Sequence, residues 1–99
     1  MTRVLNVAAA QMGPIEREDS RADVVERLVT LLRMAAGRGA DLVVFPELAL
    51  TTFFPRWWYE DGDPALDAWF ETEVPGPDTK PLWDEAVRLG VGFCLGFAE

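Results

Sequence analysis

One glutamate in this sequence occupies a position that suits a catalytic carboxylate. Glu47 follows the short apolar run 42–45, which has the composition of a buried strand. Open α/β sheets place their ligand sites at the carboxyl ends of strands. A carboxylate held there is fixed in place and partly desolvated, which suits a general base. Glu47 is therefore the candidate catalytic residue, and the alternative is a carboxylate that hydrogen-bonds loop backbone or caps the next turn.

Aromatic residues follow this glutamate closely. Phe53, Phe54 and Trp57 are candidates for the wall of a substrate pocket. The alternatives are a subunit contact and a lid that packs on its own domain. Arg56 lies between Phe54 and Trp57 in the sequence. It either meets a substrate carboxylate or stays solvated and stacks on a neighbouring indole, which is the commoner outcome for arginine.

The remaining reactive side chains favour structural roles. Cys94 lies in an apolar run without a base in sequence reach, so it is expected to pack as a small buried hydrophobe. Lys80 stands near a predicted helix start and is expected to be solvated. The chain has no histidine and one cysteine. It therefore cannot complete a Ser-His-Asp or Cys-His site, and we expect no zinc site.

Composition limits the class of partner. The 99 residues suffice for one domain, with a formal net charge of −8. That charge argues against binding nucleic acid or an anionic membrane surface, since both require a basic face. No apolar run approaches the roughly 18 residues of a membrane span. A single cysteine cannot form an internal disulfide, which fits a reducing compartment, and we expect a cytoplasmic protein.

The first half of the sequence predicts a β-α-β unit. Apolar segments 4–12 and 41–45 are expected to be strands, and apolar residues on both faces of the second indicate a parallel sheet covered on both sides. Ser20, with Asp23 three residues later, has the pattern of a helix N-cap. The helix that follows carries one apolar stripe and ends near two glycines; these positions are Val24, Leu28, Leu31, Leu32, Ala35, Gly37 and Gly39.

The second half predicts two helices and a third strand. Asp63 and Pro64 have the pattern of an N-cap and first helical position. A longer helix begins after Asp78 or Thr79 and ends at Gly90. Its inward residues are expected to be Leu82, Trp83, Ala86, Val87 and Leu89. Segment 91–98 is the third strand, in which Gly92 and Gly96 indicate close backbone approach or a bulge. The predicted order is β-α-β-loop-α-α-β, and the fold class is α/β.

Several stretches of this sequence resemble the nitrilase superfamily of carbon-nitrogen hydrolases. The matching segments are 9–14, 43–47, 75–77, 90–93 and 96–99. Segments 45–57 and 71–77 are similar to N-carbamoyl-D-amino acid hydrolases in particular. The resemblance covers all 99 residues.

The resemblance implies the first part of a four-layer α-β-β-α sandwich and a Glu-Lys-Cys catalytic triad. Glu47 matches the family's general base, which takes the proton of the cysteine thiol. The thiolate then attacks the carbamoyl carbon, the lysine stabilises the oxyanion, and water resolves the covalent intermediate. An N-carbamoyl-D-amino acid would give a D-amino acid, ammonia and carbon dioxide. The family needs no cofactor and generally forms homo-oligomers.

The sequence departs from the family pattern in one important respect. Lys80 and Cys94 do not match the family's lysine and nucleophile, which lie beyond residue 99, and the family's carboxylate-binding arginines also lie downstream of Arg56. We therefore expect residues 1–99 to be the truncated N-terminal part of a single hydrolase domain, inactive alone. The alternatives are another nitrilase-superfamily amidase or nitrilase, and a non-catalytic remnant that binds a partner through its aromatic loop.

Overall fold

The computed structural model describes residues 3–99. In chain order its elements are β1 (Val7–Ala9), α1 (Arg21–Gly37), β2 (Leu42–Val44), the 3₁₀ turn η1 (Phe54–Arg56), α2 (Pro64–Asp67), α3 (Lys80–Leu89) and β3 (Gly92–Cys94). The predicted β-α-β-loop-α-α-β order is confirmed. The three strands form one parallel sheet in the order β1-β2-β3, with β2 in the centre.

The strands are shorter than predicted, with three residues each. Three rungs join all three strands, and the first of them aligns Val7, Leu42 and Gly92. Single backbone hydrogen bonds continue the pairing beyond the strands. The Ala10 amide donates to the Val44 carbonyl over 2.8 Å. The predicted strand segments therefore lie side by side in an extended conformation, but only three residues of each form a regular β-strand.

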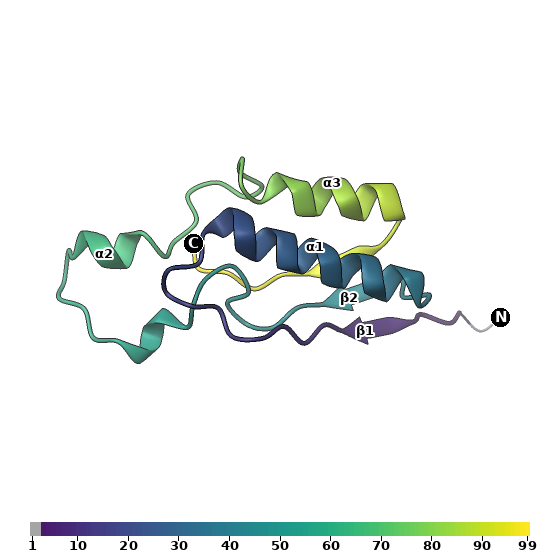
Figure 1. Cartoon of the computed structure of the whole chain (residues 1–99), viewed down its shortest axis with the longest axis horizontal. Helices are drawn as coiled ribbons and strands as arrows, with labels where there is room; N and C mark the ends of the chain where they lie inside the picture. Colours follow the sequence, from purple (N-terminus) through teal and green to yellow (C-terminus); the bar gives the residue numbers. More distant parts are fainter. Residues whose placement is uncertain (1–2) are drawn as a thin grey trace.

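Both long helices lie on the same face of the sheet (Figure 1). Ser20 caps α1 as predicted, since its Oγ accepts a hydrogen bond from the Asp23 amide over 3.1 Å. The core lies between the helices and β2, and its fully buried side chains include Leu28, Leu32, Val43, Leu50 and Leu82. Burying each leucine contributes about 1.5–3 kcal/mol, so this single layer of contacts holds the helices on the sheet.

The opposite face of the sheet is exposed in residues 3–99, which corrects the expectation that Cys94 is buried. The apolar composition of the strands is typical of a parallel sheet covered on both sides. The third rung of the sheet instead exposes Ala9, Val44 and Cys94. Their side chains point away from the helices because residues alternate between faces along a strand. Residues 3–99 thus form two layers, a helical layer and a sheet, while the four-layer sandwich remains a prediction.

Helix α3 corrects one further expectation. Leu82 and Ala86 face the core as predicted, but Val87 is 82% exposed. Successive helical residues are rotated by about 100°, so Val87 turns away from the stripe that Leu82 and Ala86 define. Gly90 ends the helix as predicted, with a left-handed φ of 68°. In the part of the chain that the structure describes, no helix is both long enough and apolar enough to cross a membrane.

Candidate functional site

Two backbone hydrogen bonds fix the turn that carries Glu47. On one side, the Phe45 amide donates to the Cys94 carbonyl over 3.1 Å. On the other side, the Ala49 amide donates to the Gly96 carbonyl over 2.9 Å. Both acceptors belong to β3 or to the segment that follows it. The turn is therefore attached to the neighbouring strand before and after Glu47, and its position is set by the sheet.

Two local features accompany this attachment. A Cβ atom placed on Gly96 would lie 3.5 Å from the Glu47 Cα, which is ordinary van der Waals contact, so the two backbones are neighbours but their approach does not require the predicted glycine. Leu48 adopts a left-handed backbone with φ of 49°. That conformation costs a residue with a side chain about 1–2 kcal/mol. A strained residue directly after a candidate catalytic group is typical of functional turns.

The Glu47 side chain is exposed, so the predicted partial desolvation is wrong for residues 3–99. Phe45, two residues earlier, takes the buried position, and the turn carries Glu47 outward. Within the described residues, the Glu47 carboxylate accepts no hydrogen bond and joins no ion pair. The alternative role, in which the carboxylate hydrogen-bonds loop backbone or caps the next turn, therefore has no contact to support it.

Glu47 lines a small hollow at the carboxyl ends of β1 and β2. Its volume is about 170 Å³. The wall consists of residues 12–15, 46–49, Thr51, Phe53 and Arg56. Sites for drug-sized ligands occupy about 300–1,000 Å³, so this hollow fits a smaller chemical group. The contribution of residues 12–15 was not predicted from the sequence.

The larger hollows lie elsewhere and have a different character. One of about 350 Å³ follows the edge of β1 beside α1, and its wall contains no carboxylate, lysine or cysteine. Another of about 570 Å³ lies beside β3 and α3 and is lined only by apolar residues and glycines. Neither of these two offers a group for acid-base chemistry. A third, of about 320 Å³, contains Glu26 and Asp78 but lies between α1 and the start of α3, away from the strands. The smaller hollow at Glu47 has a carboxylate at the carboxyl ends of the strands and is therefore the candidate site.

The three aromatic pocket candidates have different surroundings. Phe53 is 47% exposed and lines the hollow with Glu47. Phe54 is buried and packs against Trp69 and Phe70, with ring centroids 6.2 and 5.7 Å apart. Trp57 is half-buried and is not among the residues that line the hollow. The structure thus brings Phe53 to Glu47 and directs Phe54 into a separate aromatic cluster.

Arg56 stacks on its neighbouring indole and also lines the hollow. Its guanidinium lies 5.6 Å from the centroid of the Trp57 ring, which confirms the predicted stacking. Its Nε donates a hydrogen bond to the Phe53 carbonyl over 3.2 Å. The same residue lines the hollow.

The other reactive groups lie outside the hollow. Lys80 forms an ion pair with Asp84 on its own helix, with Nζ and Oδ2 2.9 Å apart. Cys94 points to the exposed face of the sheet. Over residues 3–99, no group of three histidine, cysteine or acidic side chains is arranged to hold a metal ion. Among the residues that line the hollow, Glu47 is the one with a carboxylate.

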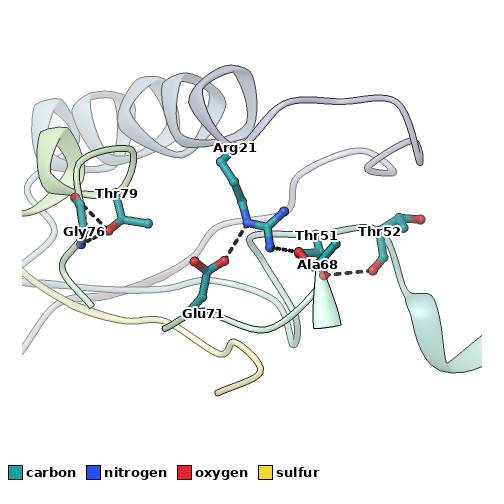
Figure 2. A network of polar contacts seen from close by, with 7 residues as sticks. All are labelled: Arg21, Thr51, Thr52, Ala68, Glu71, Gly76 and Thr79. Atoms are coloured by element: carbon teal, nitrogen blue, oxygen red, sulfur yellow. Dashed lines mark hydrogen bonds and ion pairs between the residues drawn. The ribbon is translucent and has the colours of Figure 1, made fainter. Parts of the chain in front are cut away.

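A polar clamp secures the loop that carries the aromatic residues (Figure 2). Arg21, at the start of α1, donates through Nε to the Glu71 carboxylate over 2.6 Å and through Nη2 to the Ala68 carbonyl over 2.7 Å. The Glu71 amide in turn donates to the Ala98 carbonyl over 2.7 Å. The clamp joins α1, the segment after α2 and the segment that follows β3. It therefore fixes the C-terminal end of the region that contains η1 and α2.

The sequence matches a known protein family. A family model described as carbon-nitrogen hydrolase matches residues 6–99. The matched range includes all three strands, Glu47 and every residue that lines the hollow.

Proposed function

Because the chain belongs to the carbon-nitrogen hydrolase family, we propose that it provides the general base, Glu47, of an enzyme that hydrolyses N-carbamoyl-D-amino acids. The observation that carries the proposal is the position of Glu47 in a small hollow at the carboxyl ends of two parallel strands, where its carboxylate has no partner among residues 3–99. The sequence of segments 45–57 and 71–77 supports the narrower choice of substrate.

In the proposed reaction Glu47 accepts the proton of a cysteine thiol. The thiolate attacks the carbamoyl carbon while a lysine ammonium stabilises the oxyanion, and ammonia leaves. One water molecule then releases the acyl group, which gives the D-amino acid and carbon dioxide. Lys80 and Cys94 do not fit these roles, since Lys80 is paired with Asp84 and Cys94 faces away from the helices. The proposal therefore assigns the lysine and the nucleophile to residues outside 1–99.

The small volume of the hollow suits the carbamoyl group. A planar group of three heavy atoms needs one narrow opening and one base within hydrogen-bond reach. Phe53, at the rim, supplies an apolar surface for a substrate side chain. The site is expected to act on a small molecule, and the complete enzyme is expected to be a cytoplasmic homo-oligomer.

The test is an assay of the full polypeptide that the gene encodes. It is incubated separately with an N-carbamoyl-D-amino acid, its L enantiomer, an aliphatic amide and a nitrile. We expect ammonia and D-amino acid in equal amounts from the D substrate. Ammonia from the amide or the nitrile alone would identify a different member of the superfamily. The absence of ammonia from all four would contradict the hydrolase proposal and favour a non-catalytic module.

A further inference from the structure

The pairing between the segments that follow β2 and β3 is irregular, because the two sides use different numbers of residues. The Phe45 amide donates to the Cys94 carbonyl over 3.1 Å. The next such bond runs from the Ala49 amide to the Gly96 carbonyl over 2.9 Å. In a regular parallel pair, both strands advance by two residues from one such bond to the next. Here the β3 side advances by two and the β2 side by four, so the β2 side contains a β-bulge of two additional residues.

This bulge turns Glu47 away from the core. Side chains two positions apart share a face along a regular strand, so residue 47 would lie on the same face as Phe45. Phe45 is buried in the core, whereas Glu47 is exposed and lines the hollow. Bulges re-aim side chains and are common next to active sites. The additional residues therefore place the carboxylate at the hollow instead of in the core.

Leu48 closes the bulge with an unusual backbone conformation. Its φ is 49°, and within residues 3–99 it is the only residue other than glycine with a positive φ. A Cβ atom placed on Gly96 would lie 3.5 Å from the Leu48 amide nitrogen, so the backbone lies against the neighbouring segment at this residue. A left-handed backbone is disfavoured for leucine and more so for a side chain branched at Cβ. Asparagine adopts it more readily, because its short polar side chain can hydrogen-bond locally.

We propose that Leu48 is a positioning residue for the general base, because its left-handed backbone closes the bulge that holds Glu47 at the hollow. This inference rests on the proposed function for the role of Glu47, whereas the bulge itself does not depend on any reaction. The competing explanation is that the leucine side chain is needed as an apolar part of the wall of the hollow.

The two explanations predict opposite tolerance to substitution at this position. Asparagine keeps the left-handed backbone and loses the apolar side chain. Isoleucine keeps the apolar volume and resists the left-handed backbone. A role in closing the bulge therefore favours Leu48→Asn, and a role in lining the hollow favours Leu48→Ile.

The test compares these two variants in the full encoded polypeptide, with N-carbamoyl-D-alanine as substrate. Displacement of a catalytic group by about 1 Å can lower the rate about a hundredfold, so we expect kcat of Leu48→Ile to be about tenfold to a hundredfold below that of Leu48→Asn. KM is expected to be similar in both, because the displaced base acts in the chemical step. The matched controls are Leu31→Asn and Leu31→Ile, at a half-buried leucine on α1 outside the hollow. No difference in kcat is expected between these two.

Amide hydrogen exchange supplies a second measurement that needs no turnover. The Ala49 amide is bonded to the Gly96 carbonyl at the end of the bulge, so its exchange rate reports whether the bulge is closed. Faster exchange in Leu48→Ile than in Leu48→Asn supports the role of Leu48 even if no substrate is hydrolysed, and the proposed function alone has then failed. Equal exchange of Ala49 in both variants, or a kcat of Leu48→Ile equal to or above that of Leu48→Asn, would overturn the inference and leave the proposed function intact.

Discussion

Phe53 and Phe54 are neighbours in the sequence with opposite environments in the structure. Phe53 borders the hollow at Glu47, and Phe54 is the buried centre of a cluster with Trp69 and Phe70. Both were equal pocket candidates from the sequence, because residue type alone does not show which way a turn directs a side chain. The stacking of Arg56 on Trp57 was predictable, since adjacent residues meet whatever the rest of the fold does.

Substitution of the two phenylalanines by alanine separates these roles. Phe54→Ala leaves a cavity between two aromatic rings and is expected to lower the free energy of unfolding by about 3 kcal/mol. Phe53→Ala removes a half-exposed ring and is expected to lower it by less than about 1 kcal/mol. Urea unfolding followed by circular dichroism measures both. Equal losses in the two variants would contradict the assignment of Phe54 alone to the core.

At the scale of the elements, an ion triad joins the two long helices. Glu85 on α3 is buried and pairs with Arg33 on α1, with Nη2 and Oε2 2.7 Å apart. Arg88, one turn further along α3, binds the same carboxylate. The hydrogen bond from Arg33, followed by that from Arg88, lowers the pKa of Glu85 below its ordinary value of 4.5.

This lowered pKa makes the stability of the helix pair depend on pH. The folded state favours the ionised carboxylate, so the stabilisation is fully present above about pH 4.5 and disappears as the pH falls through the folded pKa. Glu85→Gln is therefore expected to be less stable than wild type at pH 7, with a difference that shrinks below pH 4.5. Urea unfolding across this range measures the difference. Glu60→Gln, at an exposed glutamate without an ion pair, is the control. A difference that stays constant with pH would contradict the assignment.

The residues that begin and end the helices could be predicted from the sequence because capping interactions are local. Ser20 and Asp63 accept hydrogen bonds from amides two or three residues later, and Gly90 takes the left-handed backbone that ends α3. The Arg33–Glu85 pair joins residues 52 positions apart, and no local pattern indicates it. The prediction that Val87 faces inward was wrong for a similar reason, because packing on the sheet decides which side of the helix faces the core.

At the scale of the whole molecule, the sheet has one covered face and one exposed apolar face. The strand sequences indicated cover on both sides, and the helices of residues 3–99 supply it on one side only (Figure 1). Strand composition shows that a face is apolar but not which segment covers it. The candidate site likewise could be predicted only in part from the sequence. The sequence identified Glu47, while its meeting with residues 12–15 and Arg56 depends on the parallel alignment of β1 and β2.

The most direct measurement is the ammonia-releasing activity of Glu47→Gln in the full encoded polypeptide, with N-carbamoyl-D-alanine as substrate. Glu60→Gln removes an exposed carboxylate outside the hollow and serves as the control. A general base contributes about 10²–10⁴-fold to the rate, so Glu47→Gln is expected to lower kcat at least about a hundredfold without loss of folding stability. Activity of Glu47→Gln equal to that of Glu60→Gln would show that Glu47 is not the base.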